Sequence, residues 1–123
     1  MRLLVDTQVA IWWLSGDRHL SKSTRLAIER ADDAYLSAVS LWEMLIKVEA
    51  GRLEVPLGFV DALRDDFVEL RLTSDHVVQG RALPPLHRDP FDRMLIAQAQ
   101  AEGLTIVTSD ETIPRYGVPV LVA

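Results

Sequence analysis

The sequence predicts an α/β fold built on a mainly parallel sheet of about five strands, and three observations support this. Short strand-like apolar runs alternate along the chain with longer helix-like segments, which is typical of α/β layers. The junctions carry helix-end signals, because Asp89-Pro90 can begin a helix and Gly51 and Gly103 stand where helices should end. Acidic residues also follow the first apolar run, at Asp6, and the last strong one, at Asp110.

Each expected element is bounded by the hydrophobic pattern and by residues that favour its ends. The strand-like runs are Arg2–Val5, Ala34–Ser37, Val68–Leu72, Thr105–Thr108 and Pro119–Val122. The helix-like segments are Thr7–Leu14, Ser23–Arg30, Ala38–Ala50, Gly58–Asp66, Ser74–Ala82 and Pro90–Glu102. Ser21 or Ser23 can cap the second helix, and Ser74 can cap the fifth.

Length and composition limit the function classes. A chain of 123 residues has the length of one domain, so we expect residues 1–123 to fold as a single unit. The chain has no cysteine, which excludes disulfides and thiolate metal sites and fits a reducing cytoplasm. Its net charge of −5 disfavours a passive nucleic-acid-binding module but is compatible with a nuclease. No apolar run is long enough for a signal peptide or a membrane span, so no membrane contact is expected.

Asp6 and Asp110 are expected to meet at one edge of the sheet. In open parallel sheets, functional residues collect beyond the carboxyl ends of the strands, where the strand order reverses. If the winding reverses after the first three strands, the strands that precede Asp6 and Asp110 become neighbours. Two carboxylates about 4 Å apart repel by roughly 4 kcal/mol at an effective dielectric constant of 20, so a cluster of them favours a bound cation.

Glu43 and Asp92 are the other candidates, and each also has an ordinary structural explanation. Glu43 can pair with Lys47 on a solvated face, although its helix is apolar nearly all round and is expected to be largely buried. Asp89 can cap the last helix, and Asp92 in the first turn can simply favour the positive helix end. If all four carboxylates meet, they form an oxygen-rich pocket suited to Mg²⁺ or Mn²⁺ and to phosphodiester hydrolysis.

Other catalytic patterns are missing from the sequence. The three histidines are dispersed and neighbour no cysteine, which disfavours a zinc site. There is no glycine-rich phosphate loop and no nucleophile elbow. Trp12 and Trp13 cannot both face inward on one helix, so they are candidates for a partner interface.

Four segments that together span almost the whole chain resemble the motifs of the PIN-domain family, and within it the VapC-like toxins of type II toxin–antitoxin pairs. They are Leu3–Thr7, Ser37–Glu43, His87–Ala99 and Gly103–Asp110. In the family the third acid lies eleven residues before the glycine that ends its helix and eighteen before the fourth acid, which selects Asp92 over Asp89. One departure is Gln8, where close relatives often carry histidine.

The resemblance implies a three-layer α/β/α fold, Mg²⁺- or Mn²⁺-dependent RNA cleavage, homodimerisation and a cognate antitoxin. It implies that Asp6, Asp92 and Asp110 bind the metal directly, while Glu43 acts through water or on the nucleophile. The accessory residues would be Thr7, Thr108 and Ser109. The cations that could hold RNA, or equally serve solubility, are Arg18, Lys22, Arg25, Arg88 and Arg93.

Two other interpretations remain open at this point. A catalytically silent PIN-like domain could serve as a protein- or RNA-interaction module, but it predicts loss of one or more acids, and all four are here. A phosphoaspartate receiver domain would need adjacent acids after the first strand and a lysine after the last. Asp6-Thr7 and the lysine-free C-terminal segment disfavour it.

Overall fold

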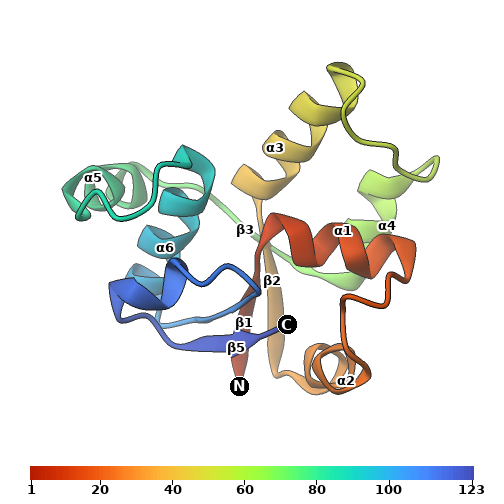
Figure 1. Cartoon of the computed structure of the whole chain (residues 1–123), viewed down its shortest axis with the longest axis horizontal. Helices are drawn as coiled ribbons and strands as arrows, with labels where there is room; N and C mark the ends of the chain where they lie inside the picture. Colours follow the sequence, from red (N-terminus) through yellow and green to blue (C-terminus); the bar gives the residue numbers. More distant parts are fainter.

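Strands and helices alternate along the chain in the computed structural model, which describes all 123 residues (Figure 1). The strands are β1 (Arg2–Val5), β2 (Asp33–Ser37), β3 (Val68–Leu70), β4 (Thr105–Thr108) and β5 (Val120–Val122). The helices are α1 (Thr7–Ser15), α2 (Lys22–Arg30), α3 (Ala38–Glu49), α4 (Phe59–Asp66), α5 (Ser74–Ala82) and α6 (Pro90–Glu102), with a 3₁₀ turn η1 (Ile113–Tyr116). The α/β class and every expected element are confirmed.

The five strands form one sheet in the order β3-β2-β1-β4-β5, and every neighbouring pair is parallel. Leu4 in the central strand β1 is in register with Tyr35 of β2 on one side and with Ile106 of β4 on the other. The winding therefore runs outward from β1 through β2 to β3 and then restarts on the other side at β4. The expected reversal of strand order between β1 and β4 is confirmed, and it brings the residues that follow these two strands together.

Two apolar cores cover the two faces of the sheet, because alternate strand residues point to opposite sides. Leu3 and Val5 belong to one core, which α1, α2, α3 and α4 help to form. Leu4 and Ile106 belong to the other, which is closed by α6 and by η1. Figure 1 shows α5 and α6 on the side of the sheet opposite α1, α2 and α4. The arrangement is the three-layer α/β/α fold that the sequence led us to expect.

The helix ends agree with most of the expected caps and correct one. The Asp89 side chain accepts hydrogen bonds from the first turn of α6, and Gly103 ends that helix with a φ of 67°. Ser21 caps α2 as expected. Helix α5, however, is capped by Thr73 and not by Ser74, because the Thr73 side chain and the His76 ring each hydrogen-bond the other residue's backbone N–H.

Helix α3 is less buried than its sequence indicates. Its buried positions include Glu43 and Met44, but Trp42 is 59% exposed and Leu45 and Ile46 are 38% and 42% exposed. The apolar pattern around the helix therefore leaves one face uncovered by this chain, and the expectation of burial on most of the circumference was wrong. Separately, no helix of the structure combines the length and apolar character needed to cross a membrane.

Candidate functional site

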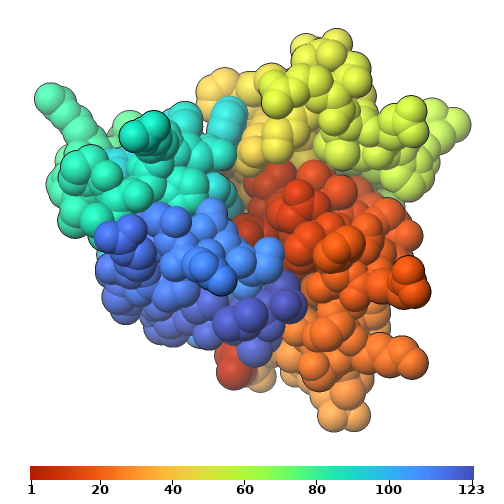
Figure 2. Space-filling view, in the orientation of Figure 1, coloured from red at the N-terminus to blue at the C-terminus, as the bar shows by residue number.

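All four predicted carboxylates line one pocket of about 380 Å³ at the carboxyl ends of β1 and β4. We call this group, Asp6, Glu43, Asp92 and Asp110, the carboxylate pocket. The space-filling view shows the N-terminal segment, the α3 region and the C-terminal third of the chain meeting on one face (Figure 2). The predicted accessory residues Thr7 and Ser109 also line the pocket, together with Gln8, Ile11, Lys47 and Asp89.

Asp6 joins β1 to α1 and does two jobs. Its Oδ1 accepts the backbone N–H of Val9 at 2.8 Å, so it caps the helix, while its Oδ2 accepts a short hydrogen bond from the Thr108 hydroxyl. Burial raises the pKa of Asp6, the hydrogen bonds from Thr108 and Val9 oppose that rise, and the charges of Asp110 and Glu43 add to it. Asp6 therefore caps α1 and also lines the carboxylate pocket.

Glu43 is held in place on one oxygen and left free on the other. Its Oε2 lies 2.9 Å from Nζ of Lys47, the expected pair one turn along α3. Its Oε1 is buried and has no hydrogen-bond partner, and the same is true of the Thr7 hydroxyl. A buried carboxylate oxygen without a partner is costly, so these two atoms are the ones that a bound ligand would satisfy.

Asp92 is the most perturbed group of the pocket. Burial raises its pKa to about 7, and the negative charges of Asp89, Asp6 and Glu43 act in the same direction against the opposing effect of His87. Asp89 itself is tied to the α6 N-terminus, where its Oδ1 accepts the N–H groups of Phe91 and Asp92. Asp89 therefore caps α6, as expected, and both Asp89 and Asp92 line the pocket.

Asp110 follows β4 and is held by three other groups. Its Oδ1 accepts the backbone N–H of Thr112 at 2.8 Å, its Oδ2 lies 2.7 Å from Nε2 of His87, and its own N–H donates to the Thr108 hydroxyl. Burial acts to raise the pKa of Asp110, but the hydrogen bonds from His87 and Thr112 outweigh it and the pKa is lowered. Thr108 therefore links Asp6 to Asp110, which gives this accessory residue a definite structural place.

The donor set of the pocket fits a hard divalent cation. Carboxylates predominate among the residues that line it, with the polar side chains of Thr7, Gln8 and Ser109 and one cation, Lys47, and no thiol exists in the chain. Such oxygen ligands select Mg²⁺ or Mn²⁺ over softer metals. Burial and the neighbouring acids raise the pKa values of Asp6 and Asp92, and Oε1 of Glu43 has no partner, so a bound cation would be favourable there.

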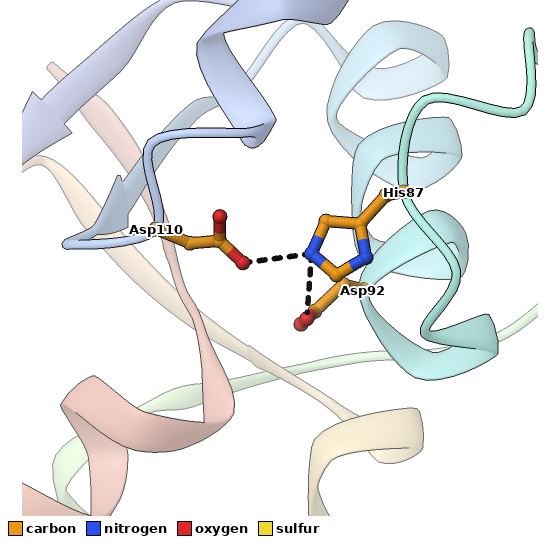
Figure 3. A group of neighbouring side chains, drawn as sticks. All are labelled: His87, Asp92 and Asp110. Atoms are coloured by element: carbon orange, nitrogen blue, oxygen red, sulfur yellow. Dashed lines mark hydrogen bonds and ion pairs between the residues drawn. The ribbon is translucent and has the colours of Figure 1, made fainter.

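His87 is a residue of this site that the sequence analysis did not select. Its Nε2 lies between Asp110 and Asp92, and ligand atoms of the three residues lie within 4.8 Å of one another (Figure 3). The dispersion of the histidines argued against a metal role and drew attention away from it. The usable signal was its place in the loop just before the helix cap, two residues ahead of Asp89.

The five predicted RNA-binding cations fall into two groups. Arg18, Lys22 and Arg88 are exposed and take part in no salt bridge. Arg25 instead lies over the Trp13 ring at 4.8 Å, and the Arg93 guanidinium donates to several backbone carbonyls, including those of Gly80 and Leu83. The last two are engaged in holding the fold together, which lessens their availability for phosphate.

Trp12 and Trp13 are both half-buried, so neither side chain is a full member of the core and neither is fully exposed to solvent. Trp12 stacks on His19, and the Trp13 Nε1 donates to Asp66 at 2.9 Å while its ring packs against Phe67. Both tryptophans therefore pack against other side chains of the chain and remain partly exposed. The most exposed tryptophan is Trp42, whose ring contacts Phe91 edge-on.

The sequence of this chain is similar to those of known proteins. A family model described as "PIN domain" matches residues 3–119. The protein "Ribonuclease VapC22" of Mycobacterium tuberculosis (strain ATCC 25618 / H37Rv) is 31% identical over 121 residues, which is 95% of this chain and 93% of that protein.

Solved structures share the fold at low identity. The VapBC2 structure from Rickettsia felis, bound to a promoter DNA fragment, matches with a TM-score of 0.75 at 13% identity and covers 98% of each chain. A toxin–antitoxin complex from Klebsiella pneumoniae matches with a TM-score of 0.71 at 20% identity, over 98% of this chain and 96% of that one. FitAcB from Neisseria gonorrhoeae matches with a TM-score of 0.70 at 16% identity, over 98% and 96%.

Proposed function

The chain belongs to the PIN-domain family, and from that membership we propose that it is a metal-dependent endoribonuclease that acts as the toxin of a type II toxin–antitoxin pair. The observation that carries the proposal is the meeting of four carboxylates from distant parts of the chain in one pocket. The similarity to a protein named as a VapC ribonuclease supports the reaction class. We further propose that residues 1–123 act as one domain, since both apolar cores share one sheet.

We propose that Asp6, Asp92 and Asp110 hold Mg²⁺ or Mn²⁺ directly and that Glu43 acts through water or on the nucleophile. Bound there, the metal would lower the pKa of a water and neutralise charge that develops on the scissile phosphate. Support comes from the buried, unpartnered Oε1 of Glu43 and from the raised pKa of Asp92.

The surrounding residues would fix the carboxylates in a reactive arrangement before substrate arrives. Lys47 holds one oxygen of Glu43 and so turns the other toward the pocket. The Thr108 hydroxyl donates to Asp6 and accepts from the Asp110 backbone, which couples the two strand ends. A carboxylate that is already oriented loses little freedom when it binds a metal or water, and this lowers the cost of reaching the transition state.

RNA would be held by exposed cations. Arg88 stands beside the cap of α6, and Arg18 and Lys22 lie in and after the loop that follows α1. Phosphate contacts supply most of the affinity for nucleic acid and weaken with salt. We therefore propose Arg88, Arg18 and Lys22 as the leading RNA contacts, with Arg25 and Arg93 as secondary candidates because other groups already engage them.

An antitoxin and a second copy of this chain are the proposed protein partners. The matched solved structure from Klebsiella pneumoniae is described as a toxin–antitoxin complex, which supports the antitoxin. The exposed apolar face of α3, formed by Trp42, Leu45 and Ile46, adjoins the pocket because Glu43 lies on the same helix. Light scattering and antitoxin titration of Trp42→Ala, Trp12→Ala and Trp13→Ala would show which tryptophan contributes to an interface.

The test is cleavage of single-stranded or looped RNA with and without Mg²⁺. We expect cleavage that EDTA abolishes and that Asp92→Asn reduces by about a hundredfold or more, since it removes a metal-binding oxygen. Asp89→Asn is the matched control, because asparagine caps a helix as well as aspartate does and should leave most activity. Metal-independent cleavage would contradict the proposed mechanism, and a folded chain without cleavage of any RNA would favour the silent interaction module.

A further inference from the structure

His87 is wedged between two carboxylates of the pocket. Its Nε2 lies 2.7 Å from Oδ2 of Asp110 and 3.2 Å from Oδ2 of Asp92, as the dashed lines of Figure 3 show. The ring is well buried, with only 12% of its side chain exposed. A ring nitrogen at this place could either bind the metal or donate a hydrogen bond to the carboxylates.

The other ring nitrogen decides between these two roles. The backbone N–H of Asp89 donates to Nδ1 of His87 at 3.1 Å, so Nδ1 must offer a lone pair. In that tautomer the ring proton is on Nε2, which therefore donates to Asp110 and lies beside Asp92. A metal-binding histidine shows the opposite arrangement, because its second ring nitrogen carries the proton and donates it to an acceptor.

Side chains of two residues, Tyr116 and Arg93, hold the loop that carries His87. The Tyr116 hydroxyl accepts the N–H groups of Leu86 and His87 at 3.1 and 2.8 Å and donates to the carbonyl of Pro84 at 2.8 Å. Nη1 of Arg93 also donates to the Pro84 carbonyl at 2.9 Å. These bonds fix the backbone below the ring, so the imidazole keeps its place between the carboxylates without needing a metal.

We propose that His87 is a positioning residue whose Nε2–H holds Asp92 and Asp110 together at the pocket, and that it is not a metal ligand. The proposal rests on the proposed function, since it concerns the same pocket. A donor between two like charges reduces their repulsion and prevents them from turning apart. Groups that orient metal ligands in this way typically contribute about 10- to 100-fold to metal affinity.

Two substitutions separate the hydrogen bond from the ring. In His87→Gln the amide nitrogen reaches the level of Nε2 and can still donate to Asp110, whereas in His87→Asn it is too short. Calorimetric titration with Mn²⁺ should show His87→Asn and His87→Ala binding about 10- to 100-fold more weakly than wild type, with His87→Gln recovering most of the loss. His19→Ala is the control, because His19 is exposed and pairs with Asp17 away from the pocket.

Nitrogen NMR of ¹⁵N-histidine-labelled wild-type protein tests the tautomer without any substitution. We expect an unprotonated Nδ1 and a protonated Nε2 in the metal-free protein, and we expect Nε2 to keep its proton when Mg²⁺ saturates the pocket. Loss of that proton on Mg²⁺ binding would make His87 a ligand and overturn the proposal. Equal Mn²⁺ affinity of wild type and His87→Asn would overturn the His87 proposal and leave the proposed function intact. A wild-type chain that binds no Mn²⁺ would contradict the proposed function as well.

Discussion

Helix α6 contributes to a polar cluster at each of its ends. The two clusters differ in how many of their polar atoms find hydrogen-bond partners within the cluster. The N-terminal end contributes Asp92 to the carboxylate pocket, where like charges gather and one buried Glu43 oxygen has no partner. The C-terminal half contributes Gln98 and Glu102 to a second cluster, which contains mainly uncharged groups and in which each buried polar atom of Gln98 and His76 has a partner.

The second cluster, which we call the Gln98 network, consists of Ser37, His76, Gln98 and Glu102. The Ser37 hydroxyl donates to Oε1 of Gln98 at 2.6 Å, and Nε2 of Gln98 donates to the Arg71 carbonyl at 3.4 Å. Nδ1 of His76 accepts the Thr73 N–H, so its Nε2 carries the proton and donates to Glu102 at 2.9 Å. Polar groups that hydrogen-bond one another stabilise the fold, whereas crowded charges without partners favour a bound ligand, so α6 contributes to one cluster of each kind.

Removing Gln98 should have the largest effect on stability. Gln98→Leu leaves the Arg71 carbonyl and the Ser37 hydroxyl without their buried partner, and we expect the free energy of unfolding to fall by about 3 kcal/mol. Urea denaturation measures this. Gln100→Leu, two residues along on the exposed face, is the matched control and should change stability by less than about 0.5 kcal/mol. Equal effects of the two substitutions would show that Gln98 contributes no more to the free energy of unfolding than an exposed glutamine does.

Neutralising Asp92 should have the opposite sign in the metal-free protein. At a pH above its raised pKa of about 7, the wild-type carboxylate is ionised although it is largely buried and lies beside other acids, and Asp92→Asn removes both the cost of burying its charge and the repulsion. We expect the free energy of unfolding to rise by about 2 kcal/mol with EDTA present. The same substitution should remove most of the stabilisation by Mg²⁺. If Asp92→Asn is less stable than wild type in EDTA, the charge of Asp92 does not destabilise the metal-free protein.

The pH dependence of stability should follow from the same group. Because the folded pKa of Asp92 is raised from 3.8 to about 7, its favourable contribution is complete below the unfolded value and is lost as the pH rises through about 7. The raised pKa of Asp6 acts in the same direction, while the lowered pKa of Asp110 contributes stability that is lost only in acid. We expect the metal-free protein to lose about 1 to 2 kcal/mol between about pH 5 and pH 8, and Asp92→Asn to lose less.

The cap of α5 should give the smallest effect. Thr73→Ala removes the side-chain half of the reciprocal bonding with His76 and should cost about 1 kcal/mol, whereas Thr73→Ser should cost almost nothing. Thermal unfolding measures both. Because Thr73 lies far along the chain from the carboxylates, neither change should alter Mg²⁺ stabilisation, and a change in that quantity would show that the two clusters are coupled.

Local patterns in the sequence were sufficient to predict the framework of the site. Asp6 and Asp110 end their strands, so the reversal of strand order alone brought them together. The Asp89-Pro90 pair marked the start of α6, and Asp92, which the motif spacing selected, lines the pocket beside the capping residue Asp89. Each of these features depends on neighbours in the sequence or on a general rule of sheet topology.

The missed features depend on where distant side chains end up. His87 reached the pocket because Tyr116, 29 residues further on, holds its backbone. Arg93 was selected as a possible phosphate contact, and nothing in the sequence indicated that its guanidinium also donates to carbonyl groups of the preceding loop. Gln98 lies in a polar-looking stretch, and only the close packing of α6 against the sheet buries it completely. Such contacts have no local signature.

Thermal unfolding with and without millimolar Mg²⁺, for wild type and for Asp6→Asn, tests most directly whether the carboxylate pocket binds metal. Asparagine keeps an oxygen that can accept the Val9 N–H and cap α1, so the substitution removes charge with little loss of local structure. A ligand that binds only the folded state adds RT ln(1 + [L]/Kd) to its stability. We predict that Mg²⁺ raises the Tm of wild type and leaves that of Asp6→Asn nearly unchanged; an identical response of the two proteins would contradict the metal site placed here.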